Sequence, residues 1–241
     1  MKIFLAGASG AIGRRLTPLL LAAGHSVTGT TRSAEKAREL NAHGVEAAVV
    51  DVFDGKALHD AVARARPEIV IHQLTDLPQV FDPARLADVL VRNTRLREEA
   101  TPNLVAAAQA AGARRLIAQS IAFAYADGPE PHAESDPIAS AEGGEPRAIT
   151  ARGVRALERA VLDARGLEGI VLRYGRLYGP GTWNNPNTRA PLHVDAAAHA
   201  ALLAITRGAP GIYNIAEDDG AVTAEKARKE LGFDSAFRLP A

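Results

Sequence analysis

The chain has 241 residues, of which 47% are hydrophobic and 5% aromatic, a composition that favours helices packed on a parallel sheet. Its 28 basic and 28 acidic residues cancel, so no net charge would attract nucleic acid or a membrane surface. The sequence has no cysteine, which excludes disulfides, thiolate catalysis and cysteine-ligated zinc. Its seven histidines lack the spacing of metal ligands, and we expect no metal site.

Strand and helix patterns alternate from residue 3 onward. Apolar runs predict strands at 3–6, 27–31, 45–50, 69–72, 115–119 and 170–173, and the stretches between them predict helices at 11–23, 34–43, 56–65, 83–111 and 154–164. Pro102 is expected to kink or divide the longest helix. Residues 127–147 are rich in Gly, Pro, Asp and Glu and predict an excursion or lid loop. This succession is typical of a Rossmann-type α/β fold with a doubly wound parallel sheet.

The pattern changes after Tyr178-Gly179-Pro180-Gly181. Residues 182–191 are polar and irregular, and a helix at 194–205, a strand at 211–215 and a helix at 223–231 follow. We therefore expect a dinucleotide-binding domain over residues 1–181 and a short C-terminal cap, 182–241, packed on the same domain. No apolar run reaches the length of a membrane span and the first strand follows Met-Lys directly, so we expect a soluble cytoplasmic protein with no membrane partner.

A glycine-rich loop joins the first predicted strand to the first predicted helix. Residues 7–13 read Gly-Ala-Ser-Gly-Ala-Ile-Gly. In this context Gly7 permits a tight turn, Gly10 lets the backbone approach a pyrophosphate, and Gly13 allows close packing of helix on strand. The helix N-terminus then offers free N–H groups to the anion. The expected cofactor contacts of this loop are Gly7, Ser9, Gly10, Ala11, Ile12 and Gly13.

The end of the second predicted strand indicates which dinucleotide binds. An acidic residue there would bind the adenosine ribose, but this strand ends Thr30-Thr31-Arg32, and the next carboxylate is Glu35. Arg32 can pair with a 2′-phosphate and Ser33 can donate to it. The alternative is that Arg32 is only a surface residue at a strand end. We predict that NADP(H) is preferred over NAD(H).

These motifs resemble the extended short-chain dehydrogenase/reductase superfamily, in particular its NAD-dependent epimerase/dehydratase-like members. The glycine loop, the pair Asp51-Val52, the run Ile71–Leu74, the segment Leu172–Gly181 and the segment Leu192–Ala196 carry the resemblance. It implies that Asp51 and Val52 contact adenine. It also implies that Gln73 and Leu74 flank a cofactor ribose. His193 and Asp195 would have a structural role. Tyr174 stands at the end of its predicted strand and either lines the nicotinamide pocket or, as an equally good interpretation, packs in the core. Related proteins form dimers through two long helices, which implies a homodimer through residues 83–111 and 150–165.

The catalytic pattern of this superfamily is missing. Its members use a Tyr acid/base with a Lys four residues later, because a phenol needs a nearby cation to lose its proton at neutral pH. None of the four tyrosines here has such a partner, and the helix register places Thr150 and Val154 at those positions. The superfamily's hydroxyl position falls on Ile121.

Ser120 and Tyr125 are therefore the candidate catalytic hydroxyls. Each also has a structural interpretation: Ser120 as a hydroxyl bonded to backbone, and Tyr125 as a packing aromatic. Ser120, at the end of a central strand, is also an expected cofactor contact.

Polar residues on the predicted helix 83–111 and strand 69–72 receive structural interpretations. Arg92, Arg95 and Arg97 stand with two glutamates and predict a solvated helix face, which we favour over an anion site. His72 ends its strand and is interpreted as a buried histidine with satisfied hydrogen bonds.

Two functions fit the sequence. The leading hypothesis is an NADP(H)-dependent oxidoreductase or epimerase/dehydratase-like enzyme acting on a small carbonyl, alcohol or sugar-derived substrate, with the nicotinamide supplying the chemistry. The alternative is a catalytically silent NADP(H)-binding sensor or scaffold, favoured by the missing Tyr-Lys pair and the short C-terminal region. A deep pocket beside the nicotinamide with convergent polar groups would favour the enzyme.

Overall fold

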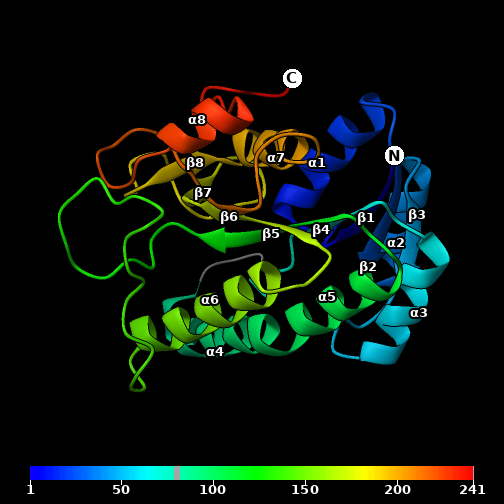
Figure 1. The fold of residues 1–241 in the computed structure, drawn as a ribbon, viewed down its shortest axis with the longest axis horizontal. Helices are drawn as coiled ribbons and strands as arrows, with labels where there is room; N and C mark the ends of the chain where they lie inside the picture. Colours follow the sequence, from blue (N-terminus) through cyan, green and yellow to red (C-terminus); the bar gives the residue numbers. More distant parts are fainter. Residues whose placement is uncertain (79–81, 241) are drawn as a thin grey trace.

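A seven-stranded parallel sheet forms the centre of the protein (Figure 1). The computed structural model describes residues 1–78 and 82–240. Its strands lie in the order β3 (Glu46–Val49), β2 (Ser26–Thr31), β1 (Lys2–Ala6), β4 (Ile69–His72), β5 (Arg115–Ile121), β6 (Glu168–Tyr174) and β9 (Gly211–Ile215). Because the strand order reverses between β1 and β4, the crevice at their carboxyl ends is where such sheets bind ligands. The predicted Rossmann-type fold is confirmed.

Helices cover both faces of this sheet (Figure 1). Side chains of α1 (Ala11–Ala22), α2 (Ala34–Ala42), α7 (Val194–Leu203) and α8 (Glu225–Leu231) join one buried apolar cluster. Side chains of α3 (Gly55–Ala65), α5 (Thr101–Ala110) and α6 (Pro146–Leu162) join another on the opposite face, where α4 (Leu86–Arg95) lies along α6. The apolar faces of the helices are thereby removed from water against strands that are buried on both sides.

The helical region predicted at 83–111 is present, but Pro102 does not divide it. A short 3₁₀ turn, Pro83–Arg85, leads into α4, and Leu96–Ala100 forms a π-helical turn between α4 and α5. Pro102 lies in the first turn of α5, where its missing N–H costs little. The irregularity therefore comes before the proline, in a wide turn that changes which side chains face inward.

One predicted boundary is wrong by more than a turn, and the other predicted helices and strands differ from the structure by about two residues or fewer at each end. The helix expected at 154–164 begins at Pro146 and so takes in the end of the expected loop 127–147. Proline is well tolerated at this first helical position. Two short strands were not predicted: β7 (Arg176–Tyr178) and β8 (Pro191–His193), which pair in parallel. Each has only three residues, too few for a periodic pattern to show in the sequence.

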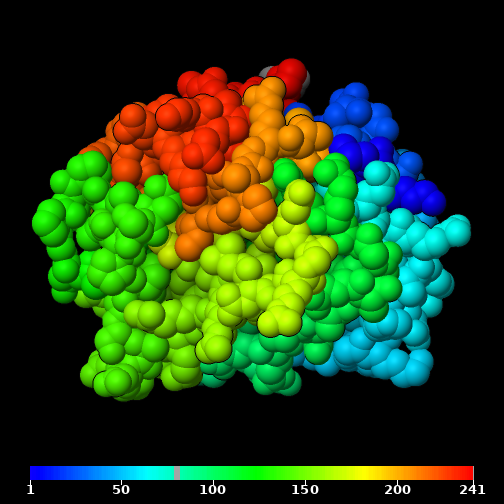
Figure 2. All heavy atoms as spheres, in the orientation of Figure 1, coloured from blue at the N-terminus to red at the C-terminus, as the bar shows by residue number. Residues whose placement is uncertain are grey.

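The C-terminal residues belong to the same body as the rest of the chain. Strand β9 pairs along β6 over five residues, so the expected cap, 182–241, contributes a strand to the central sheet. In the space-filling view the C-terminal residues, in red, form a continuous surface with the segments beside them (Figure 2). The domain boundary predicted at residue 181 stays a prediction. The pairing of β6 with β9 joins strands from the two sides of that boundary. Among the helices described, none is long and apolar enough to cross a membrane.

Candidate functional site

The glycine loop has the close contacts that its sequence predicts. Gly7 has φ +91°, and a Cβ at this position would lie 2.5 Å from the carbonyl oxygen of Gln73. A Cβ at Gly13 would collide with the carbonyl oxygen of Gly7. The Gly10 N–H donates to that same oxygen at 3.0 Å, which closes the turn. Only glycine fits at Gly7 and Gly13, because the backbone itself fills the space.

The N-terminus of α1 is open to an anion. Gly10 is its N-cap and has no side chain to bond the first N–H groups, and the first turn holds no acidic residue. A Cβ at Gly181 would be 3.6 Å from Cβ of Ala11, so the loop after β7 borders this N-terminus. Free N–H groups and the positive end of the helix dipole therefore face the edge where a pyrophosphate would lie.

The end of β2 carries both a hydrogen-bond link to the loop and a cationic cluster. Thr30 accepts the N–H of Gly7 through Oγ1 at 3.1 Å. Arg32 follows, two-thirds exposed, with its guanidinium 3.7 Å from the carboxylate of Asp76. Arg92 contacts the same carboxylate at 3.1 Å. Ser33 caps α2 by accepting the N–H of Lys36. Two positive charges and one negative charge thus lie together at the end of β2.

Asp51 and Val52 lie just beyond β3, at the same edge of the sheet. Asp51 accepts the N–H of Phe53 at 3.0 Å, which leaves its carboxylate at the surface. Val52 is buried, and its carbonyl accepts from the side chain of Asn103 at 3.2 Å. The apolar side chain of Val52 and the carboxylate of Asp51 thus lie in consecutive positions at this edge of the sheet.

Gln73 and Tyr174 link the glycine loop to the far half of the site. The Nε2 of Gln73 donates to the phenolic oxygen of Tyr174 at 3.2 Å, and both side chains are buried. The Oε1 of Gln73 is buried without a hydrogen-bond partner in the described part of the chain. Burial raises the pKa of Tyr174, so its hydroxyl stays protonated. An unpaired buried acceptor beside a glycine cradle fits a ligand donor such as a ribose hydroxyl or a carboxamide.

Ser120 and Tyr125 are held in one buried polar network. Ser120 donates to Glu158 at 2.8 Å, and Arg173 forms a two-pronged ion pair with the same carboxylate at 2.8 and 2.7 Å. The hydroxyl of Tyr125 donates to Asn214 at 2.6 Å and accepts from Arg173 at 2.9 Å. Burial raises the pKa of Tyr125, although Arg173 opposes the shift. Both hydroxyls bond side chains, and neither bonds a backbone group of residues 1–78 or 82–240.

Thr150 and Val154, the residues that the predicted helix register places at the superfamily's Tyr and Lys positions, cannot replace a Tyr and a Lys chemically. Thr150 donates to the carbonyl of Pro146, one turn earlier in the same helix. Val154 is fully buried in apolar surroundings, together with Ile121. Neither side chain is a cation, and neither lowers the pKa of a neighbouring hydroxyl.

Arg97 places a cation beside Gly153, next to Val154, which the sequence did not lead us to expect. It lies on the π-helical turn, and its Cδ would be 3.2 Å from a Cβ added at Gly153, so this glycine makes room for it. No described residue forms a hydrogen bond or ion pair with its guanidinium. Burial lowers the pKa of Arg97 to about 10, partly offset by Glu158, so it remains charged at neutral pH. The predicted solvated face is wrong for this residue, because the wide turn directs it inward while Arg92 and Arg95 pair at the surface.

His72 is a buried histidine with satisfied hydrogen bonds, as interpreted from the sequence. Its Nδ1 accepts the N–H of Leu74 at 3.3 Å, which leaves Nε2 to donate to Thr101 at 2.9 Å. Burial lowers the pKa of His72 to about 4, so the ring is neutral under physiological conditions. It fixes the backbone at Leu74 beside the cofactor edge.

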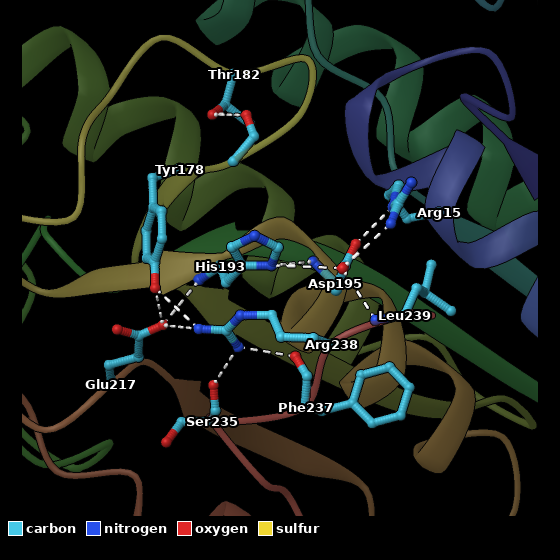
Figure 3. A network of polar contacts seen from close by, with 11 residues as sticks. Arg15, Tyr178, Thr182, His193, Asp195, Glu217, Ser235, Phe237, Arg238 and Leu239 are labelled. Carbon is cyan, nitrogen blue, oxygen red and sulfur yellow. Dashed lines mark hydrogen bonds and ion pairs between the residues drawn. The ribbon is translucent and has the colours of Figure 1, made fainter. Parts of the chain in front are cut away.

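His193 and Asp195 belong to a polar network that fastens the loop bordering the glycine turn (Figure 3). Asp195 accepts from Arg15 of α1 at 2.5 Å and from the backbone N–H of Leu239 at 3.0 Å. The ring of His193 packs edge-on against Tyr178, with centroids 5.1 Å apart. Arg238 and Tyr178 both bond Glu217, as Figure 3 shows. These contacts are structural, and they hold the segment Tyr178–Gly181 against α1.

Two surface pockets do not decide between an enzyme and a catalytically silent cofactor-binding protein. One of about 390 Å³ lies among the loop residues 126–142 and the start of α6, and one of about 460 Å³ lies near the amino ends of β1 and β2. Neither touches the glycine loop. Among the residues described, no group of three His, Asp or Glu side chains could hold a metal ion.

Taken together, the glycine cradle, the uncapped helix and the orphan acceptor of Gln73 fit a nicotinamide dinucleotide. The model of the NAD dependent epimerase/dehydratase family matches residues 3–191. The chain belongs to that family.

Its relatives are reductases and epimerases. It is 39% identical to a 3-diazoavenalumate denitrifying reductase from a Streptomyces species, over 93% of this chain and 79% of that one. It is 31% identical to a dTDP-4-dehydrorhamnose reductase from Streptomyces griseus, over 73% of this chain and 49% of that one. Among solved structures, the UDP-glucose 4-epimerase of Thermotoga maritima superposes with a TM-score of 0.78 at 18% identity, covering 99% of this chain and 94% of that one. A Thermus thermophilus UDP-glucose 4-epimerase with NAD gives 0.74 at 23% identity, covering 97% and 84%.

Proposed function

We propose that this chain is an NADP(H)-dependent reductase of a small organic substrate. The observation that carries the proposal is the cationic end of β2, where Arg32 and Arg92 outnumber Asp76 beside an otherwise complete dinucleotide cradle. The 39% identity to a reductase supports the direction of the reaction. The bound nicotinamide would supply hydride to the substrate, and the protein would supply position and charge.

The predicted cofactor contacts divide among three parts of the dinucleotide. Asp51 and Val52 would hold adenine, and Arg32 its 2′-phosphate. The loop from Gly7 to Gly13, with Ser9, Ala11 and Ile12, would cradle the pyrophosphate at the start of α1. Gln73, Leu74 and Tyr174 would hold the nicotinamide half, where the unpaired Oε1 of Gln73 awaits a donor.

Arg97 is the residue that we propose in place of the missing lysine. Its guanidinium remains charged, lacks a carboxylate partner among the described residues, and approaches Gly153, next to the Val154 that stands at the lysine position. A fixed cation there stabilises negative charge that develops on a substrate during hydride transfer. It cannot act as a base, because a guanidinium keeps its proton at neutral pH. Ser120 and Tyr125 remain the proposed hydroxyl donors, each held by the Glu158–Arg173 network.

A direct assay tests this function. Purified protein would be titrated with NADPH and NADH and then given 3-diazoavenalumate, the compound in its relative's name, alongside a panel of small aldehydes and ketones. We expect tighter binding of NADPH and its oxidation in the presence of at least one of these compounds. Equal or tighter binding of NADH would reject the NADP preference.

A silent NADP(H)-binding protein is the second candidate, because both predicted catalytic hydroxyls are already bonded to side chains. Tight NADPH binding with no oxidation across the whole panel would favour it over the reductase.

We also propose a cytoplasmic homodimer. Helices α4 and α6 lie together on the outside of one face, and Leu86, Val91 and Leu162 are exposed apolar side chains on them. Pairing of two such faces would remove these side chains from water. Sedimentation that shows only monomer at micromolar concentration would reject the dimer, and recovery of the native protein in a membrane fraction would reject the location.

A further inference from the structure

Arg176 is a half-buried cation that stacks on an aromatic ring. It begins β7, and its Cζ lies 4.2 Å from the centre of the Phe123 ring. Among the residues that the structure describes, no carboxylate pairs with its guanidinium and no acceptor bonds it. Its backbone N–H donates to Ala190, which fixes the start of the side chain. Phe123 is 40% exposed, so the pair borders solvent.

Three other arginines in or beside the sheet have carboxylate partners. Arg173 pairs with Glu158 at 2.7 Å, Arg115 with Glu168 at 2.7 Å, and Arg15 with Asp195 at 2.5 Å. Burial lowers the pKa of Arg176, and no opposing carboxylate contributes to that shift. A cation that has lost part of its hydration without gaining an anion is costly to keep unless a ligand supplies the anion.

The position of Arg176 is at the substrate side of the proposed cofactor site. The contacts run outward from the glycine loop: Gly7 abuts Gln73, Gln73 bonds Tyr174, and Arg176 follows Tyr174 by two residues. The Ala122 N–H donates to the carbonyl of Tyr174 at 2.8 Å, which brings Phe123 alongside. Arg176 and Phe123 thus lie just beyond the carboxyl ends of β6 and β5, where ligands of open α/β sheets bind.

We propose that Arg176 and Phe123 form a subsite that binds the carboxylate of a planar, unsaturated substrate. The guanidinium fork matches a carboxylate with two parallel hydrogen bonds, and the partly exposed ring offers an apolar face to the planar part next to it. A single guanidinium balances one negative charge, which favours a monocarboxylate over a nucleotide diphosphate. This inference deepens the proposed function and rests on it for the nicotinamide placed beside the subsite.

Binding to the NADPH-loaded protein tests the subsite without requiring turnover. Trans-cinnamate is the probe, methyl cinnamate its uncharged analogue, and UDP the diphosphate competitor, each titrated by calorimetry. We expect cinnamate to bind at least tenfold more tightly than either. Arg176→Gln should weaken the binding of cinnamate at least tenfold, and Arg176→Lys should retain part of the affinity. Phe123→Leu should weaken the binding of cinnamate and of methyl cinnamate by the same factor.

The controls separate this inference from the proposed function. Arg64→Gln, an exposed change at the end of α3, should leave cinnamate binding unchanged, and Arg176→Gln should bind NADPH within about twofold of the parent protein. Carboxylate-selective binding that depends on Arg176, without NADPH oxidation by any tested compound, would keep the subsite and reject the reductase. Cinnamate binding that is undetectable, or equal to that of methyl cinnamate, or unchanged in Arg176→Gln, would overturn the subsite. Displacement of cinnamate by equimolar UDP would also overturn it in favour of a nucleotide.

Discussion

Arg32 and Asp76 form an ion pair at the carboxyl edge of the sheet, with the guanidinium 3.7 Å from the carboxylate. Asp76 follows β4, so the fold brings it to the end of β2 from 44 residues further along the chain. The guanidinium is 66% exposed, and an exposed pair of this kind contributes at most about 1 kcal/mol. A 2′-phosphate can therefore displace the carboxylate at little cost, especially since Arg92 holds Asp76 from the other side.

This pair makes the cofactor preference testable by charge. Arg32→Ala should weaken NADPH binding by about tenfold to a hundredfold, because a charge-assisted bond to phosphate is worth about 1.5–3 kcal/mol, and should leave NADH nearly unchanged. Asp76→Asn should tighten the binding of NADPH, because it removes a carboxylate whose negative charge repels the 2′-phosphate. Fluorescence titration measures both, with Arg38→Ala on exposed α2 as the control. An equal loss for the two cofactors would show that Arg32 does not contact the 2′-phosphate.

Arg97 is expected to set the rate of hydride transfer. Arg97→Met should lower kcat at least tenfold, because a developing negative charge loses its fixed cation. Arg97→Lys should restore part of the activity. Its kcat should fall at a lower pH than that of the parent protein on the alkaline side of the pH profile, because a desolvated ammonium loses its proton more readily than a guanidinium. The matched control is Arg95→Met, at the end of α4 directly before the π-helical turn but paired with Glu99 at the surface. A loss of kcat that lysine does not relieve would assign Arg97 a packing role.

Features that depend on local sequence were predictable. The glycine spacing determines the turn at Gly7, which has φ +91°, and the helix contact at Gly13, where a Cβ would meet the backbone of Gly7 and Ala8 in the same βα unit. The contact of Gly7 with Gln73 comes from a later part of the chain, after β4. Arg32 and the cap at Ser33 follow from their places at a strand end and a helix start. The strands of the parallel sheet were found for the same reason, since burial on both faces makes each one a continuous apolar run.

Features that depend on contacts between distant segments were not predictable. The inward direction of Arg97 requires the π-helical turn before Pro102 and the absence of a side chain at Gly153, more than 50 residues away. The Ser120–Glu158 bond joins β5 to α6, and no spacing rule specifies it. Gly153 was the available signal, because a glycine inside a helix usually marks a close approach of another group.

The Glu158–Arg173 pair should be important for stability. Both side chains are buried, and Glu158→Gln would leave the guanidinium of Arg173 without a compensating charge. Breaking such a pair costs about 3–5 kcal/mol, so we expect the free energy of unfolding to fall by that order. Urea denaturation measures it, with Glu98→Gln on the exposed Arg152 pair as the control. Equal stability of the two variants would mean that Arg173 finds another partner.

Ser120 and Tyr125 can be tested separately from this pair. Ser120→Ala removes one hydrogen bond to a carboxylate that keeps Arg173, and Tyr125→Phe removes a hydroxyl that bonds both Asn214 and Arg173. Each should cost about 1–2 kcal/mol of stability. If the hydroxyls also bond substrate, kcat/KM should fall at least tenfold in variants that are still fully folded at the assay temperature. Folded variants with unchanged kcat/KM would limit both residues to a structural role.

His72 should make the folded state sensitive to acid. Its pKa is lowered from 6.5 to about 4, so between these values the unfolded chain binds a proton that the folded protein excludes. Stability therefore falls as the pH drops from 6.5 towards 4, and the contribution of His72 reaches about 3 kcal/mol at the lower end. His25, His193 and His199 have lowered pKa values too and add slopes of the same sign. His72→Gln should flatten the dependence measured by urea denaturation at successive pH values, whereas His59→Gln at the surface should leave it unchanged. An identical slope in His72→Gln would show that the buried ring accepts a proton without unfolding, which its contacts with Thr101 and Leu74 argue against.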